Sequence, residues 1–169
     1  DVDGTTGTSL LLLFFKEIGY PVDYYIPHRL KEGYSLNPKA LTYLKEKGAH
    51  VVITVDNGIS AYDDSIVAKK LGLDLIITDH HQVPEKKPEA LAIINPHQHD
   101  CPFPAKEICG SGVAFYLMMA LRFRLRELGH FKNFPEPQLK NYLDLVALAT
   151  VADVVPLIDE NRIMVKHGL

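Results

Sequence analysis

The sequence predicts an α/β fold: a parallel sheet flanked by helices, followed by a helical C-terminal part. Two observations predict it. Short runs of β-branched and aromatic residues alternate with helical patterns over the first part of the chain, and only helical patterns remain from about residue 113. Near-continuous apolar strands joined by helices are typical of a parallel sheet with helices on its faces.

The strands come first in this prediction. Each candidate is short, apolar and rich in residues that favour strands. The four segments are residues 22–26, 51–55, 73–78 and 91–95.

Helical patterns separate these strands, at residues 8–18, 37–47 and about 62–71. The second has a clear start, because Asn37 can cap the helix and Pro38 suits its first position. Gly48 is typical of the residue after a helix end. Two longer helices are predicted afterwards, one ending at residue 129 and one running from near residue 137 to a stop before residue 156.

Composition limits the class of protein. With 169 residues, 47% of them hydrophobic, the chain can bury one sizeable core, and we expect one domain over residues 1–169. There is no run of about 18 apolar residues, so no membrane span is expected. Two cysteines give no disulfide framework, which predicts a cytoplasmic protein. Because the chain opens on Asp1 rather than Met, we expect a fragment.

Charge gives a weaker indication. The net charge is −3, whereas a generic nucleic-acid binder is usually basic. Several acids clustered in one metal site would distort that count.

Acids and imidazoles follow two of the predicted strands. Asp56 comes directly after residues 51–55, and Asp79, His80 and His81 follow residues 73–78. In open parallel sheets, ligands bind beyond the carboxyl ends of the strands. We therefore expect these side chains at one edge of the sheet, forming a site.

Each of these two motifs has a plainer alternative. Asn-Gly after Asp56 is a hairpin signal, but a hairpin needs a second strand at once, and residues 59–72 look helical. The triplet at residues 79–81 could instead cap a helix, with histidines facing solvent.

The residue types at these strand ends indicate which metals they could bind. Carboxylate and imidazole without thiolate suit Mn²⁺, Mg²⁺ or Fe²⁺.

Three further acids are candidates. Asp1 and Asp3 stand two apart, so both carboxylates would face one point in an extended segment; the alternative is a helix cap in a Thr-rich turn. Asp153 interrupts an apolar stretch, where an unpaired carboxylate would be costly. It could also be a C-terminal turn residue or part of a salt bridge.

Two motifs have competing interpretations. Ser111 and Gly112 stand at the start of a long helix, where free amides can bind an anion, although an ordinary tight turn fits equally well. A second group has the elements of a zinc site but not its usual spacing, which favours a surface loop with reduced thiols. Its members are His97, His99, Cys101 and Cys109.

Taken together and in order, these motifs resemble the DHH superfamily of phosphoesterases. The segments are DVDG, TVDNGIS, TDHH, NPHQHDCPFP, CGSGVAF and LATVADVVPL. Two additional stretches, YIPHRLKEGYSLN and ENRIMVKHGL, are similar to the family's bacterial 5′-to-3′ exonucleases specific for single-stranded DNA. The smaller oligoribonuclease and cyclic-dinucleotide phosphodiesterase members fit less well. The resemblance implies a role in DNA repair and recombination.

The resemblance also implies two divalent ions, Mn²⁺ or Mg²⁺. Asp56 would bridge them. One ion would take Asp3, Asp56, His80 and Asp153, and the other Asp1, Asp56 and a histidine that precedes the first residue of this chain.

Substrate contacts follow from the same resemblance. It implies that His81 and Arg29 hold a substrate phosphate and that Asp79 supports the catalytic group. Ser111 and Gly112 are our candidates for a further substrate contact, through the amides of their helix start.

Single-stranded DNA is the implied partner, with a single-strand-binding protein and a helicase as possible others, and we expect a monomer. One alternative is a family hydrolase for short oligonucleotides, cyclic dinucleotides or pyrophosphate. Another is an inactive scaffold in a replication complex. A scaffold should have lost metal ligands, and every ligand position in this chain is retained. The DHH-associated domain of the family is expected beyond Leu169, and without it we expect weak DNA binding.

Overall fold

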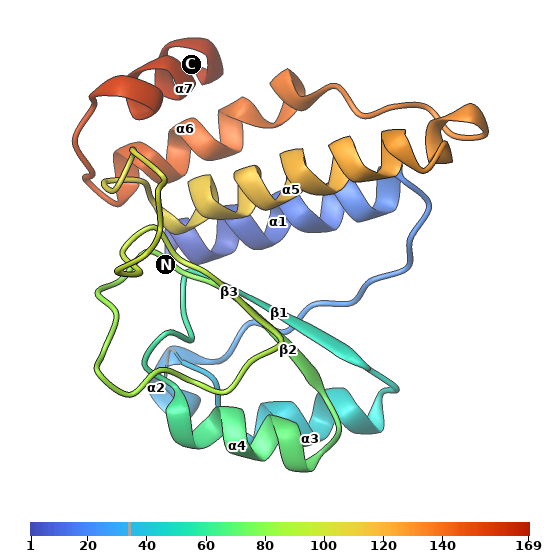
Figure 1. Cartoon of the computed structure of the whole chain (residues 1–169), viewed down its shortest axis with the longest axis vertical. Helices are drawn as coiled ribbons and strands as arrows, with labels where there is room; N and C mark the ends of the chain where they lie inside the picture. The colour runs from blue at the N-terminus through green and yellow to red at the C-terminus, as the bar shows by residue number, and fades with distance from the viewer. Residues whose placement is uncertain (34) are drawn as a thin grey trace. The chain divides into compact units, whose positions relative to one another are not determined.

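A computed structural model describes residues 1–33 and 35–169, and these divide into two compact units. Unit 1 consists of Asp1–Tyr24 and Glu107–Leu169, coloured dark blue and yellow to red in Figure 1. Unit 2 is Tyr25–Lys106, coloured light blue to yellow-green.

Unit 2 contains the predicted parallel sheet. Its strands are β1 (Val51–Val55), β2 (Asp74–Thr78) and β3 (Ala92–Ile94), in the order β1-β2-β3. Val55 pairs with Thr78, and Thr78 with Ile94, so all three strands end in the same row. The residues that follow them, at positions 56, 79 and 95, therefore leave the sheet at one edge.

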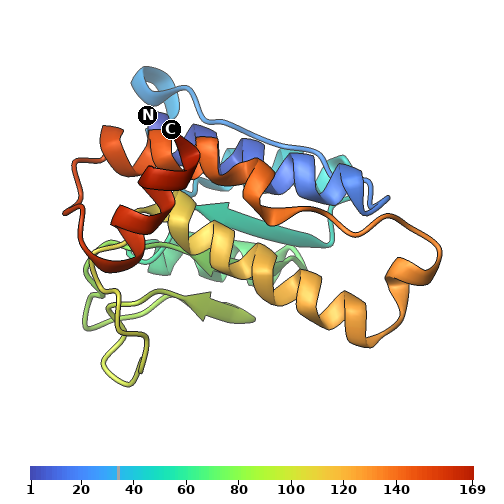
Figure 2. The same ribbon diagram turned by 90° about the horizontal axis from the view of Figure 1, so that it is seen from above.

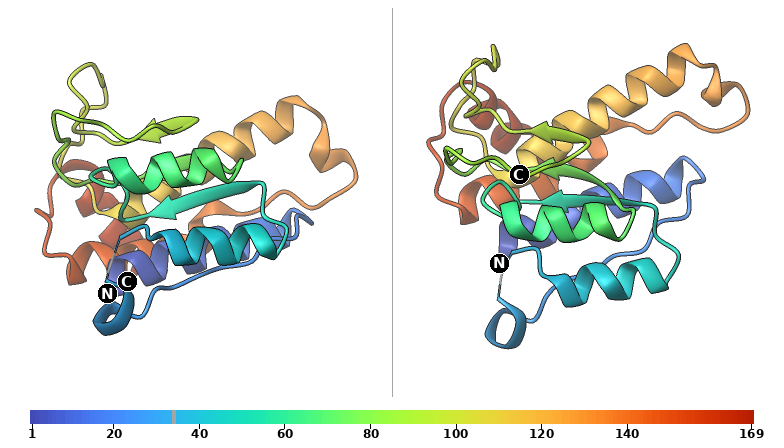
Figure 3. Two further views of the ribbon diagram at one scale, coloured as in Figure 1. Left: turned by 90° about the horizontal axis from the view of Figure 1, so that it is seen from below. Right: turned by 60° about the horizontal axis from the view of Figure 1, so that its bottom comes forward.

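Two helices of unit 2 lie together on one face of this sheet, as Figure 3 shows. They are α3 (Pro38–Glu46) and α4 (Tyr62–Lys70). Strand side chains alternate between faces, so Leu75 and Ile77 of β2 point to these helices and pack with Leu41 and Ala68. The predicted cap is confirmed, because the Asn37 side chain accepts a hydrogen bond from the Ala40 amide at 2.8 Å. A short helix, α2 (Arg29–Glu32), precedes them.

Unit 1 is helical. Its long helices α1 (Val2–Glu17) and α5 (Gly110–Glu127) lie side by side with α6 (Leu143–Ala152) packed against both (Figures 1 and 2). Two 3₁₀ turns, η1 (His130–Lys132) and η2 (Leu139–Tyr142), join α5 to α6. The core between the helices is aliphatic and aromatic, with fully buried Leu10, Phe14, Met118 and Val146.

Helix α7 (Asp159–Gly168) packs on α6, and Gly168 marks the closest approach. A Cβ atom there would lie 2.1 Å from the Leu143 carbonyl oxygen and 2.6 Å from Ala147 Cβ. Because a backbone oxygen cannot move aside, only glycine fits this contact.

The predicted fold class is confirmed, but several elements differ. Residues 22–26 form no strand: their composition favours a pleated surface, yet they pair with no strand among the described residues. The first helix starts at Val2 rather than residue 8, and α7 was not predicted. The helix predicted from residue 137 begins as the η2 turn and becomes α-helical only at Leu143.

Within the parts of the chain that the structure describes, no helix combines the length and apolarity needed to cross a bilayer.

Candidate metal centre

Asp56 leaves β1 through a backbone reversal. Its amide still donates to the Thr78 carbonyl oxygen at 3.0 Å, as a further rung of the sheet, and its φ then turns to +60°. An L residue with a side chain rarely adopts that conformation, which costs about 1–2 kcal/mol. The turn is held by Thr54, whose hydroxyl donates to the Asn57 carbonyl oxygen at 2.7 Å. Strain of this kind clusters at functional sites.

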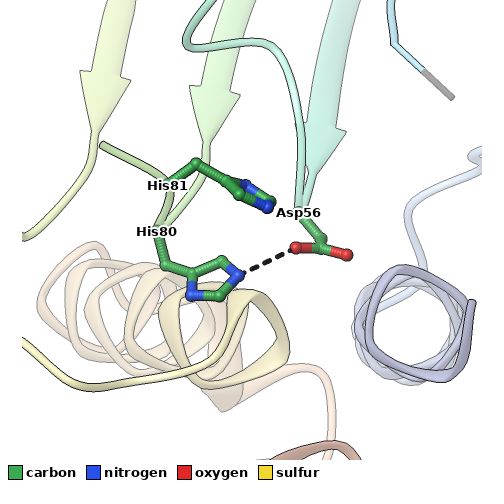
Figure 4. A group of neighbouring side chains, drawn as sticks. All are labelled: Asp56, His80 and His81. Atoms are coloured by element: carbon green, nitrogen blue, oxygen red, sulfur yellow. Dashed lines mark hydrogen bonds and ion pairs between the residues drawn. The ribbon is translucent and has the colours of Figure 1, made fainter. Parts of the chain in front are cut away.

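The loop after β2 brings two imidazoles to Asp56. His80 Nε2 lies 3.1 Å from Asp56 Oδ1, with both side chains largely buried. The His81 ring lies 4.6 Å from the His80 ring, centroid to centroid, and 59% of its side chain is exposed. Ligand atoms of all three residues lie within 4.8 Å of one another, as Figure 4 illustrates. Carboxylate and imidazole donors at this spacing fit Mn²⁺ or a similar divalent cation.

Asp79 is the buried support of this loop, with only 1% of its surface exposed. Its Oδ1 accepts from His81 Nδ1 at 2.7 Å, from the His80 amide at 2.8 Å and from the His81 amide at 3.2 Å. Its Oδ2 accepts from the Ile59 amide at 2.9 Å. A buried carboxylate is stable with this many donors. Asp79 therefore fixes the tautomer and the direction of the His81 ring.

Asn95, after β3, fixes the same loop from the other side. Its side-chain amide donates to the His81 carbonyl oxygen at 2.9 Å, and its Oδ1 accepts from the His97 amide at 2.8 Å. The sequence placed Asn95 at a strand end but did not assign it this role. The level strand ends bring it beside the loop at residues 79–81.

The alternatives for these two motifs are wrong. No second strand follows Asp56, since α4 begins at Tyr62, so the Asn-Gly pair makes no hairpin. No helix begins at residues 79–81, so the triplet caps nothing.

Unit 1 places Asp3 and Asp153 together. Asp153 ends α6 as its C-cap, in agreement with the turn alternative, and an oxygen of each carboxylate lies within 4.8 Å of the other. Both carboxylates act on the thiol of Cys109. Burial raises the pKa of this thiol to about 12, and the negative charges of Asp3 and Asp153 contribute to that rise. That thiol remains protonated. The surface loop predicted to include Cys109 is wrong for this residue, which is buried at the start of α5.

The extended arrangement predicted for Asp1 and Asp3 is wrong. Asp1 is the N-cap of α1, its side chain accepting from the Gly4 amide at 3.2 Å, and Asp3 lies in the first helical turn. Residues two apart on a helix point in different directions. Accordingly, the exposed Asp1 belongs to none of the candidate ligand groups formed by the described residues, whereas Asp3 is buried.

The start of α5 binds an anion, as one interpretation predicted, but that anion belongs to the chain itself. The amides of Gly110 and Ser111 donate to the Asp3 carboxylate at 2.6 and 2.7 Å. Gly110 and Thr6, which also contacts Ser111, were not among the predicted site residues. Gly110 could have been predicted from its place at a helix start. Nothing in the sequence indicated a role for Thr6. That Ser111 and Gly112 contact substrate stays a prediction.

Four other predicted residues lie outside the elements described so far in this site. Arg29 begins the short helix α2 on an exposed surface of unit 2. His97, His99 and Cys101 lie in the loop after β3, and no candidate ligand group among the described residues includes them. Lys106 closes that loop by donating to the carbonyl oxygens of Pro96 and Cys101.

The model of the DHH family, N-terminal domain, matches residues 1–150. The chain belongs to the DHH family. Among curated proteins, the single-stranded-DNA-specific exonuclease RecJ of Salmonella typhimurium is 48% identical over 172 residues. That alignment covers 100% of this DHH-family chain and 30% of the relative, so the chain spans less than a third of that protein.

Solved structures agree with this assignment. A crystal structure of exonuclease RecJ bound to manganese matches with a TM-score of 0.84 and 35% identity, over 99% of this chain and 40% of that one. The RecJ–Mn²⁺ complex from Thermus thermophilus matches with a TM-score of 0.76 and 32% identity, over 99% and 22% of the two chains. The DHH-family fold of the chain is thereby established.

Proposed function

We propose that this chain is the catalytic domain, over residues 1–169, of a divalent-metal-dependent exonuclease that degrades single-stranded DNA from the 5′ end. The observation that carries the proposal is the group of Asp56, His80 and His81 at the strand ends, with ligand atoms within 4.8 Å of one another. Two solved RecJ proteins similar to this chain are described as bound to manganese, which supports Mn²⁺ as the ion.

The proposed ligands of one ion are Asp3, Asp56, His80 and Asp153. Asp56 would bridge this ion and a second one, to which Asp1 would also bind. The donor set supports the assignment, because carboxylates and imidazole without thiolate suit Mn²⁺ or Mg²⁺.

Two divalent ions supply a nucleophile at neutral pH and neutralise charge on the in-line transition state of phosphodiester hydrolysis. The residues of the chain hold the ions and orient the substrate. Asp56 has the backbone conformation that fixes its carboxylate at the strand end.

His81 is suited to hold the scissile phosphate. Its Nδ1 is bound to Asp79, so Nε2 is the ring nitrogen proposed to contact a phosphate oxygen, and 59% of the side chain is exposed. Arg29 is proposed as a second phosphate contact, because a guanidinium can bind two phosphate oxygens at once.

Single-stranded DNA is the proposed substrate because the curated relative is named for it. We further propose that the protein acts in the reducing cytoplasm during DNA repair and recombination. A single-strand-binding protein and a helicase are the proposed partners, and the protein is proposed to be a monomer.

The test is degradation of end-labelled single-stranded DNA by the protein. We expect nucleotide release from the 5′ end with Mn²⁺, none in excess chelator, and recovery when Mn²⁺ is restored. Asp56→Asn should reduce the rate by at least about 100-fold, because it removes a bridging charge. Asp63→Asn, a change at an exposed acid of α4, is the matched control and should leave the rate unchanged.

Three results would contradict the proposal. One is full activity in chelator. Another is cleavage confined to cyclic dinucleotides, pyrophosphate or short oligonucleotides, which would assign the chain to another class of DHH hydrolase. The third is Mn²⁺ binding without hydrolysis of any of these substrates, the behaviour of an inactive scaffold.

A further inference from the structure

The Asp3 side chain is held by the first two amides of α5. The Gly110 amide donates to Oδ2 at 2.6 Å and the Ser111 amide donates to Oδ1 at 2.7 Å, so each carboxylate oxygen has its own donor. Asp3 is 3% exposed. Free amides and the positive end of a helix stabilise a negative charge, and charge-assisted bonds are short, as these are.

Ser111 also holds the main chain of Asp3. Its hydroxyl donates to the Asp3 carbonyl oxygen at 2.7 Å, and its Oγ lies 2.8 Å from Thr6 Oγ1. Thr6 Oγ1 is in turn 3.0 Å from the same carbonyl oxygen. Ser111 therefore binds Asp3 at both its carboxylate and its backbone, which leaves the Asp3 side chain a single direction.

The Ser111 side chain is fully buried, with 0% of the residue exposed. Its hydroxyl is committed to Asp3 and Thr6, so it acts within unit 1.

We infer that Ser111 is a positioning residue: with Thr6 bound to its hydroxyl, it fixes the orientation in which the Asp3 carboxylate binds an ion. This inference rests on the proposed function, in which Asp3 is a ligand. Groups that orient a metal ligand typically change metal affinity by about 10–100-fold when removed.

The experiment is calorimetric titration of the protein with Mn²⁺ alone, together with thermal unfolding in its absence. Ser111→Ala keeps the backbone amide and removes only the hydroxyl, and we expect the Kd for the Asp3-dependent ion to rise about tenfold. The matched control is Ser65→Ala in unit 2. Ser65 is also 0% exposed and has two bonds, to the Tyr62 carbonyl oxygen at 2.5 Å and from the Glu89 amide at 2.8 Å.

The control should lose stability to a similar extent and keep the Kd of the unmodified protein. Thr6→Ala should weaken Mn²⁺ binding in the same direction, and Thr6→Ser, which retains a hydroxyl, should restore it. Should Ser111→Ala fail to fold, Ser111→Cys replaces it, because it preserves the side-chain shape and weakens hydrogen-bond donation.

Asp3→Asn separates this inference from the proposed function. If Asp3→Asn loses an ion while Ser111→Ala and Thr6→Ala bind Mn²⁺ with unchanged affinity, Ser111 is purely structural and the inference is wrong, although the proposed function stands. If Asp3→Asn itself binds two ions with native affinity, Asp3 is no ligand and both are overturned. A rise in Kd for Ser65→Ala equal to that for Ser111→Ala also overturns the inference.

Discussion

At the scale of the residue, two acids of the candidate site are oriented by different means. Asp3 is fixed by hydrogen bonds from Gly110 and Ser111, in an ordinary helical conformation. Asp56 is fixed by its backbone, at φ +60°. The first arrangement adds stability through its bonds, whereas the second costs stability, and a substitution at Asp56 can measure that cost.

We predict that Asp56→Gly is more stable than Asp56→Ala by about 1 kcal/mol, because glycine adopts positive φ without the Cβ clash. Both variants should lose Mn²⁺ binding to the same extent. Asp63 in α4 is the control. At this helical position Asp63→Ala should be more stable than Asp63→Gly by up to about 1 kcal/mol, because alanine is the better helix former. Urea unfolding without metal measures the free energy of unfolding of all four variants. The same order of Ala and Gly at both positions would refute backbone strain at Asp56.

At the scale of the element, the start of α5 is constrained on two sides. It supplies the amides that hold Asp3, and it must also fit against the residues that precede it. Ile108 is 1% exposed, and a Cβ atom at Gly112 would lie 2.4 Å from its Cγ1 and 2.7 Å from its Cδ1.

Gly112→Ala should therefore destabilise the protein by about 1–3 kcal/mol, although alanine is the better helix former. In an Ile108→Ala background the colliding atoms are gone, and the same change should be neutral or stabilising. The free energies of unfolding of the two single variants and the double variant form the test. Additive effects would mean that Ile108 is not what excludes a side chain at position 112.

At the scale of the whole molecule, the chain folds as two compact units, and the group of Asp56, His80 and His81 lies within unit 2. An ion bound by this group would stabilise the fold of unit 2, because a ligand of the native state stabilises it by about 2.7 kcal/mol at 100 times its Kd.

Mn²⁺ should thus slow amide hydrogen exchange in unit 2. We expect added protection at Ile77 in β2, which is fully buried, and none there in Asp56→Asn. Magnetic resonance or mass spectrometry of exchange measures this. Unchanged exchange at Ile77 in saturating Mn²⁺ would contradict an ion bound at the strand ends.

Local chemistry was enough to predict much of this protein. Three strands, the helix capped by Asn37 and the placement of Asp56 and Asp79–His81 at strand ends all follow from apolar runs and cap residues close in sequence. The strand predicted at residues 22–26 is wrong because it was also inferred from local composition. A strand forms only where a neighbouring strand can pair with it, and the residues of the segment itself do not show whether one is present.

The tertiary structure decided what holds the acids. The bond between Asp3 and Ser111 joins residues 108 positions apart, and the pairing of Asp3 with Asp153 depends on the packing of α1 against α6. Likewise, Asn95 contacts the His81 loop only because β2 and β3 end in one row. Residue types and their local spacing predict which chemical groups form the site. Its geometry comes from contacts between segments that are distant in the sequence, and no local pattern encodes these contacts.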